Sequence, residues 1–132
     1  MSKDVAWGRV CSEHRLKYLI LFGSRAGGRV NGLSDWDIAV KFGRRYAPEE
    51  YLGLLAEVIE VVGSDAVDLI VLDDAPPPLL FNALWGGSPL CIKDHGEYHW
   101  DRVKASAMFS DYLVDFGRQA REWVRAWLVR GS

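Results

Sequence analysis

The chain has 132 residues, which suffices for one domain with its own hydrophobic core. With 49% hydrophobic and 26% charged residues and a formal net charge of -2, it lacks the basic surplus typical of proteins that bind long nucleic acids directly. No apolar run reaches the ~18 residues of a membrane span. Cys11 and Cys91 are too few for a disulfide scaffold, so we expect reduced thiols in a soluble, cytoplasmic protein.

The first half of the chain alternates between helical and extended patterns. The run YLILF is short, apolar and closed by Gly23, which is typical of a buried strand. The segment that begins at Asp35 alternates between apolar and polar residues, which predicts a second strand. Pro48 favours the start of a helix, and Gly63 favours its end. The predicted elements here are a helix over 5–16, strands over 18–22 and 35–42, a helix over 48–62 and a strand over 66–72.

The second half predicts one more strand and is otherwise mostly helical. Three prolines make a rigid turn before a short helix of sequence LLFNALW. Pro89 stands near the start of the next extended run, which suits an edge strand because proline donates no ladder hydrogen bond. No proline interrupts residues 100–130, where a straight helix would span about 45 Å and exceed the ~30 Å width of a small domain. Such a helix either breaks, for example near Gly117, or projects.

The order of these elements predicts the α/β class, as a two-layer fold with a mixed β-sheet and helices packed on one face. The short link between the first two strands favours antiparallel pairing. We expect a single domain over 1–132, with a C-terminal helical segment over about 100–130. An apolar stripe on that segment either covers the sheet or contacts a partner. The stripe consists of Phe116, Ala120, Trp123 and Trp127.

Three aspartates stand where strands usually carry apolar residues. Asp35 and Asp37 project from one face of a strand, about 6.7 Å apart, and their charges repel unless a proton or a cation intervenes. Mg²⁺ prefers such hard oxygen ligands and leaves its other positions to water and phosphate. Asp68 joins the pair if the third strand lies beside the second, and the three carboxylates can then hold one or two metal ions for a phosphoryl displacement. Lys41 shares this strand face and either neutralises the aspartates or touches a substrate.

The corner after the first strand suits a phosphate group. Gly23 lets a ligand approach the backbone, and a turn or helix that begins at Ser24 offers free N–H groups to an anion. Arg25 and Arg29 add positive charge for a polyphosphate. Each piece also occurs as ordinary turn chemistry, and it is their combination with the later strand aspartate that favours a nucleotide site. We therefore predict that these four residues contact the phosphates of a nucleotide.

The pattern Gly-Ser, ten residues, Asp-x-Asp and a later strand aspartate resembles the DNA polymerase β-like nucleotidyltransferase superfamily. The form GSRA-x-G-(five residues)-SD-x-D is similar to its minimal nucleotidyltransferase branch, the MntA-type antitoxins that pair with HEPN-domain toxins. The resemblance implies that Asp35 and Asp37 bind magnesium, that Gly23 and Ser24 hold the triphosphate, and that a third acid, Asp68, completes the site. Gly27 stands where family members often carry arginine, which puts the strength of ATP binding in question.

The resemblance also implies an activity and a partner. A Mg²⁺-dependent enzyme of this kind transfers AMP from ATP to a tyrosine hydroxyl of a HEPN ribonuclease toxin and thereby silences it. Two other functions stay open: nucleotidyl transfer to a small molecule such as an aminoglycoside, and neutralisation of the toxin by binding alone. The expected partners are thus ATP and a HEPN-type toxin in a hetero-oligomer, with no membrane and no directly bound nucleic acid.

Overall fold

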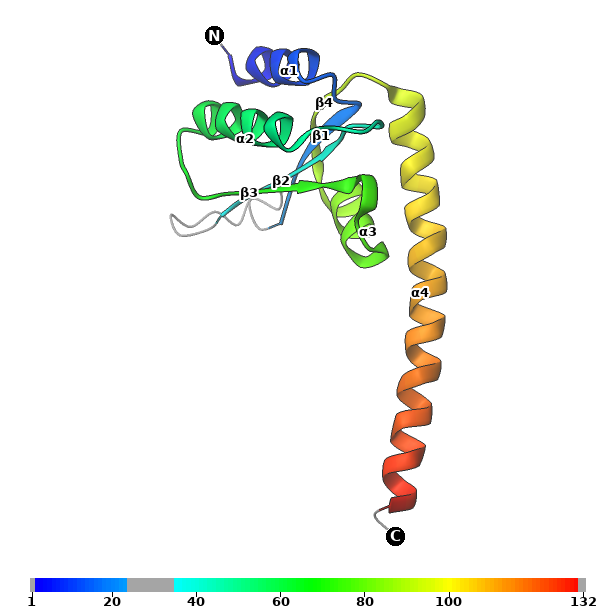
Figure 1. Cartoon of the computed structure of the whole chain (residues 1–132). Coiled ribbons are helices and arrows are strands. Elements are labelled where there is room, and N and C mark those ends of the chain that lie inside the picture. Colours follow the sequence, from blue (N-terminus) through cyan, green and yellow to red (C-terminus); the bar gives the residue numbers. More distant parts are fainter. Residues whose placement is uncertain (1, 24–34, 131–132) are drawn as a thin grey trace.

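Figure 1 shows a small α/β body from which one long helix projects. The computed structural model describes residues 2–23 and 35–130. Within these two ranges, no helix combines the length and the apolar character needed to cross a membrane. The helical elements are α1 (Lys3–Glu13), α2 (Pro48–Val62), the 3-10 turn η2 (Leu72–Asp74), α3 (Pro77–Gly86) and α4 (His95–Arg130).

One mixed sheet of four strands forms the centre of the body, in the order β3-β2-β1-β4. The central strand β1 (Tyr18–Phe22) is antiparallel to β2 (Trp36–Lys41) and to β4 (Ser88–Ile92). The third strand, β3 (Val67–Val71), is parallel to β2 and lies at one edge, while β4 lies at the other. The predicted α/β class, the mixed sheet and the edge position of the last strand are confirmed.

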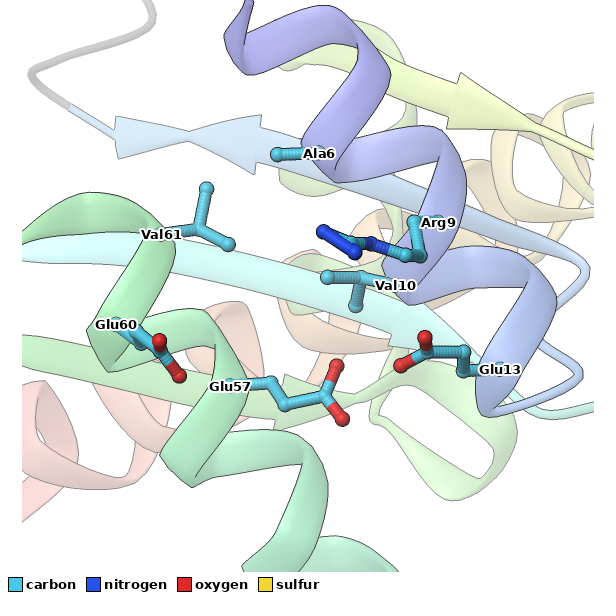
Figure 2. A pocket seen from close by; sticks show the side chains of 7 residues that line it. All are labelled: Ala6, Arg9, Val10, Glu13, Glu57, Glu60 and Val61. Carbon is cyan, nitrogen blue, oxygen red and sulfur yellow. The ribbon is translucent and has the colours of Figure 1, made fainter. Parts of the chain in front are cut away.

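Helices α1 and α2 cover one face of the sheet. Every second strand residue points there, among them the fully buried Leu19, Ile38 and Val40. Helix α2 begins at Pro48, where a missing N–H costs nothing, and ends at Gly63 with a left-handed φ of 79°. A pocket of about 430 Å³ lies between α1 and α2 (Figure 2).

Helix α3 and the first turns of α4 cover the opposite face, so helices lie on both sides of the sheet where the sequence analysis placed them on one. Periodicity shows that a helix has an apolar side, but it does not show which face of a sheet that side will cover. The sequence of β2 does not indicate a second apolar face, because Ala39 is the one apolar residue of β2 that points to this side of the sheet. The buried residues on this face are Tyr18, Ile20, Phe22, Ala39, Leu72, Ala83, Leu84 and Ala105.

Helix α4 runs without a break for 36 residues, or about 54 Å at 1.5 Å per residue. It passes through Gly117 as a regular helix, and its buried residues, Asp101 and Ala105, both lie near its start. The side chains of Trp123 and Trp127 are 69% and 63% exposed. Of the two alternatives for the apolar stripe, coverage of the sheet is therefore wrong, and the end of the helix projects (Figure 1).

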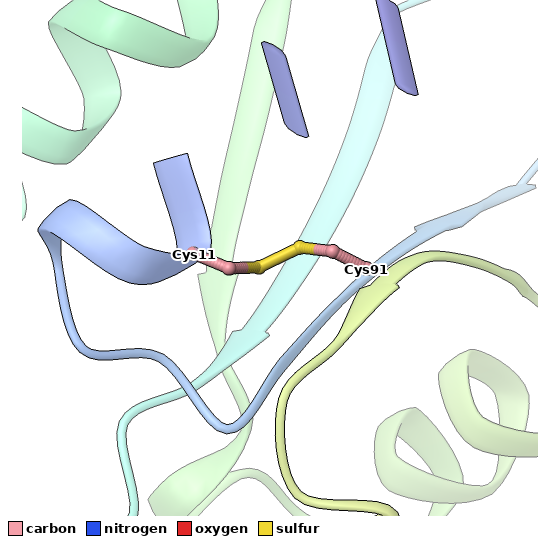
Figure 3. The surroundings of a disulfide bond; sticks show 2 residues. All are labelled: Cys11 and Cys91. Carbon is pink, nitrogen blue, oxygen red and sulfur yellow. A yellow bond between two sulfur atoms is a disulfide. The ribbon is translucent and has the colours of Figure 1, made fainter. Parts of the chain in front are cut away.

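A disulfide joins Cys11 of α1 to Cys91 of β4 (Figure 3). The expectation of reduced thiols is therefore wrong. The two residues are 80 positions apart in sequence, and their Cα atoms lie 6.7 Å apart, a separation that a disulfide can span. They meet because α1 packs against β4, a tertiary contact that cysteine spacing does not reveal.

Candidate active site

Asp37 and Asp68 are direct neighbours on two adjacent strands. The parallel register of β2 and β3 places Asp37 opposite Asp68 and Trp36 opposite Val67. Because side chains alternate along a strand, the two carboxylates share one face, while Val67 and Leu69 pack into the core on the other face. The predicted position of the third strand beside the second is confirmed, and with it the proximity of these two acids.

Asp35 adds a third carboxylate immediately before β2, at an exposed position. Partial burial raises the pKa of the Asp37 carboxyl, and the negative charges of Asp68 and Asp35 raise it further. Asp68 and Asp35 thus both repel the Asp37 carboxylate through space. Such a group gains free energy from any cation that lowers the repulsion.

Gly23 brings the end of β1 against this acidic group. Phe22 pairs with Asp37 in the antiparallel register, so the residue after Phe22 lies beside the Asp37 side chain. Gly23 has a left-handed φ of 77°, and a Cβ added there would overlap the Asp37 carboxylate. A glycine is therefore required here for two reasons, backbone conformation and space.

The other predicted phosphate contacts, Ser24, Arg25 and Arg29, lie outside the described residues, as does Gly27. Their roles stay predictions. The described residues that bracket this segment, Gly23 and Asp35, both lie next to Asp37 in the fold or in the sequence. Both of these flanking residues therefore belong to the surroundings of the acidic group.

The donor set fits a hard divalent cation, because it offers the carboxylate oxygens of three aspartates, and one of them, Asp37, is partly buried and repelled by the other two. In the described part of the chain, the one group of three possible ligands with all donor atoms within 4.8 Å is Glu13, His14 and Glu57, not the three aspartates.

Lys41 lies on the same strand face as Asp37, but its side chain pairs with a different carboxylate. Its Nζ is 3.3 Å from Oδ2 of Asp101 on α4, and the same oxygen accepts a hydrogen bond of 2.7 Å from the Tyr18 hydroxyl. Burial, together with this hydrogen bond, raises the pKa of Tyr18, which therefore stays protonated and donates. Lys41 thus neutralises Asp101 and not the three aspartates, while its contact with a substrate stays a prediction. No pattern in the sequence indicated Asp101, because its partners come from two distant strands.

The pocket between α1 and α2 is separate from the aspartates (Figure 2). Arg9, Glu13, Glu57 and Glu60 line it, and Glu57 Oε1 lies 3.1 Å from Nε2 of His14. These helices cover the face of the sheet opposite to the one from which Asp37 and Asp68 project. The pocket therefore takes no part in the candidate active site.

Comparisons with known proteins agree with this geometry. Residues 9–96 match the family model described as "Polymerase beta, Nucleotidyltransferase", a span that contains every residue of the candidate site. Over 68 residues the chain is 38% identical to "Protein adenylyltransferase MntA" of Aphanizomenon flos-aquae (strain 2012/KM1/D3), an alignment that covers 44% of this chain. The chain spans 45% of the length of that curated relative.

Solved structures show the same fold. A crystal structure of a toxin–antitoxin with AMP-PNP superposes with a TM-score of 0.76 at 21% identity, over 92% of this chain and 98% of the other. A tri-AMPylated Shewanella oneidensis HEPN toxin in complex with MNT antitoxin gives a TM-score of 0.67 at 19% identity, over 93% and 99% of the two chains. At these identities the likeness establishes the fold alone.

Proposed function

The chain belongs to the polymerase beta nucleotidyltransferase family, and on this premise we propose that it transfers AMP from ATP to a tyrosine hydroxyl of a HEPN ribonuclease toxin. It thereby acts as a cytoplasmic, Mg²⁺-dependent antitoxin. The observation that carries the proposal is the pair Asp37 and Asp68 in register, with Asp35 and Gly23 beside it. The names of the relatives, an adenylyltransferase and toxin–antitoxin complexes, support the choice of acceptor.

The residues of the site divide the binding of the metal and of the phosphates among them in this proposal. Asp35, Asp37 and Asp68 hold the magnesium, which when bound screens the charge of the triphosphate and of the departing pyrophosphate. Gly23 leaves room for a phosphate beside the backbone, because it lacks a Cβ. The predicted residues Ser24, Arg25 and Arg29 complete the contacts to the triphosphate.

The transfer is an in-line displacement. The acceptor oxygen attacks the α-phosphorus and forms a new P–O bond, while the bond from that phosphorus to the bridging oxygen of the β-phosphate breaks and pyrophosphate leaves. Asp68 accepts the proton of the attacking hydroxyl, and the acceptor keeps the AMP group as a phosphodiester. The body offers no second domain within the described residues, so the acceptor protein itself supplies the rest of the acceptor pocket.

The test is a transfer assay with labelled ATP, magnesium and the purified toxin. We expect the wild-type chain to label the toxin, and Asp37→Asn and Asp68→Asn to lower the rate at least ~100-fold. Asp65→Asn is the matched control, because Asp65 is an exposed carboxylate three residues before Asp68 and should keep wild-type rates. Mass spectrometry of the labelled toxin then identifies the acceptor side chain.

Three outcomes would contradict the proposal. If the wild-type chain transfers no AMP, or if the aspartate variants transfer it as fast as the wild type, the assigned site is wrong. If the double variant Asp37→Asn/Asp68→Asn neutralises the toxin at a stoichiometric dose as well as the wild type does, the chain acts by binding alone.

A further inference from the structure

A histidine and two glutamates come together where α1 meets α2, on the face of the sheet opposite to the aspartates. Glu13 is the last residue of α1, His14 follows it directly, and Glu57 belongs to α2. One donor atom from each of the three residues lies within 4.8 Å of the other two. The candidate active site uses none of them, so their convergence needs an explanation of its own.

The imidazole of His14 has a nitrogen that no hydrogen bond satisfies. Its Nε2 atom is buried and has no hydrogen-bond partner among the described residues, although the side chain as a whole is 16% exposed. Glu57 Oε1 lies 3.1 Å from this nitrogen, but a hydrogen bond also requires alignment, which the two groups lack. Two ligands of one tetrahedral zinc ion lie about 3.4 Å apart, because each stands about 2.1 Å from the metal. The observed separation is therefore close to that of two ligands that share an ion.

The charges at this end of α1 favour a cation. The macrodipole of a helix puts partial negative charge at its C-terminus, where basic side chains are stabilising. The last turn of α1 has no basic residue and instead ends on the carboxylate of Glu13. The neighbouring pocket is lined by three carboxylates, those of Glu13, Glu57 and Glu60, and by one cationic side chain, Arg9. A divalent cation at the cluster would cancel the charges of Glu13 and Glu57.

The fold holds two of the three side chains in place and leaves the third free to turn. Glu57 stands half-buried on a regular helix of 15 residues. The backbone of His14 is fixed from the other side, since its carbonyl accepts a hydrogen bond of 3.0 Å from the Arg44 guanidinium. Glu13 is exposed, and Figure 2 shows its carboxylate pointing toward that of Glu57. The pocket of about 430 Å³ beside them has room for the water that completes a coordination shell.

The donor types select the class of metal. Mg²⁺ takes oxygen ligands, whereas an imidazole nitrogen together with carboxylates suits zinc and similar transition ions. We propose that Glu13, His14 and Glu57 bind one Zn²⁺ ion, which ties the end of α1 to α2 and keeps a fourth position for water. The site is separate from the proposed magnesium site, and the inference does not depend on the proposed function. The competing explanation is a simple ion pair between protonated His14 and Glu57, which needs no metal.

The experiment is a calorimetric titration of the full, tag-free chain with zinc chloride, without thiol reagents. The chain carries Asp37→Asn/Asp68→Asn, so that the acidic group of the candidate active site does not contribute. We expect one zinc ion per chain, and we expect His14→Ala or Glu57→Gln to raise Kd at least ~10-fold, because each removes a ligand. Glu60→Gln is the matched control, since Glu60 lines the same pocket but is not one of the three ligands.

Two further measurements identify the ion and its place. Zinc at a hundredfold excess over Kd should raise the melting temperature by at least about 5 °C, and Glu57→Gln should lose most of this rise. Magnesium at the same concentration should not raise it. His95 and His99 of α4 stand four residues apart and could chelate zinc themselves, so His95→Gln/His99→Gln is a second control and should leave Kd unchanged.

Each outcome decides for or against the site. A chain that binds no zinc, or binds it equally well after His14→Ala and Glu57→Gln, overturns the proposal and leaves the ion pair as the explanation. Zinc binding that disappears with His95→Gln/His99→Gln overturns it as well. Circular dichroism checks that each variant folds, and Glu13→Gln supplies a ligand variant at an exposed position where the packing does not change. None of these results bears on the transfer of AMP, which is measured separately.

Discussion

Asp37 is held between a glycine that cannot be replaced without a clash and two other carboxylates that repel it. Burial is the larger cause of its raised pKa, and the charges of Asp68 and Asp35 follow. The ordinary pKa of an aspartate is 3.8. A carboxyl whose pKa rises on folding stabilises the fold at pH values below this ordinary pKa. The stabilisation is lost as the pH rises through the higher pKa of the folded state. At neutral pH the ionised group therefore opposes folding, a cost that a bound cation relieves.

Replacing Asp37 should reveal this conflict as a gain in stability. We expect Asp37→Asn to raise the free energy of unfolding at pH 7 in metal-free buffer by roughly 0.2–1 kcal/mol, the usual cost of like charges opposite each other on neighbouring strands. Urea titration at pH 7 and at about pH 4 measures the free energy of unfolding of both proteins. The difference in free energy between variant and wild type should be smaller at the lower pH. Magnesium should stabilise the wild-type chain more than the variant. A variant that is less stable than the wild type at both pH values would contradict the assigned repulsion.

Gly23 tests the same contact from the other side. We expect Gly23→Ala to destabilise the chain by about 1–3 kcal/mol, because the alanine must adopt a left-handed φ and push the Asp37 carboxylate aside. Gly8→Ala in α1 is the matched control, since nothing lies within 4 Å of a Cβ there, and it should stabilise by about 0.5–1 kcal/mol. Thermal or urea unfolding measures both changes. Equal effects of the two substitutions would mean that the space beside Asp37 is not limiting.

At the scale of elements, a buried polar cluster anchors α4 to the sheet. Asp101 is 7% exposed. Its carboxylate accepts a hydrogen bond from the Tyr18 hydroxyl and forms an ion pair with Lys41. We expect Asp101→Ala to cost about 3–5 kcal/mol, because it leaves a poorly solvated lysine and a buried hydroxyl without their partner. Asp115→Ala on the same helix breaks only an exposed ion pair and should cost ~0.5 kcal/mol or less. Urea unfolding measures the loss of stability in both variants. Similar losses for Asp101→Ala and Asp115→Ala would show that Asp101 does not anchor α4 to the sheet.

The disulfide ties α1 to β4 across 80 residues of chain. On the loop-entropy account a link over such a separation contributes about 4.5 kcal/mol. We expect dithiothreitol to lower the melting temperature of the wild-type chain and to leave that of Cys11→Ala/Cys91→Ala unchanged. Alkylation of the unfolded, unreduced protein should modify neither cysteine. Two modified thiols would show that the cysteines are reduced in solution, as the sequence analysis expected.

At the scale of the whole molecule, the body and the end of α4 are energetically separate. Residues 111–130, apart from the half-buried Gly117, are exposed and lie beyond the buried contacts of the helix, so their removal should leave the core intact. We expect a chain that ends at Ser110 to melt within about 2 °C of the full chain, because a change well below 1 kcal/mol shifts the midpoint by no more than that. Circular dichroism should lose helical signal without a loss of cooperativity. A large fall in the melting temperature would show that the projecting helix supports the body.

The amino-acid sequence by itself determined the features that depend on near neighbours along the chain. The bounds of β1 and α2 were predicted as observed, since an apolar run, a proline start and a glycine stop are local signals. The proximity of Asp35 to Asp37 is also local, because the two residues are two positions apart in the sequence. The tertiary structure alone decided four matters: the disulfide, the partner of Lys41, the face that α3 covers and the projection of α4. Each of these depends on contacts between residues far apart in sequence, and periodicity carries no information about which distant surfaces will meet.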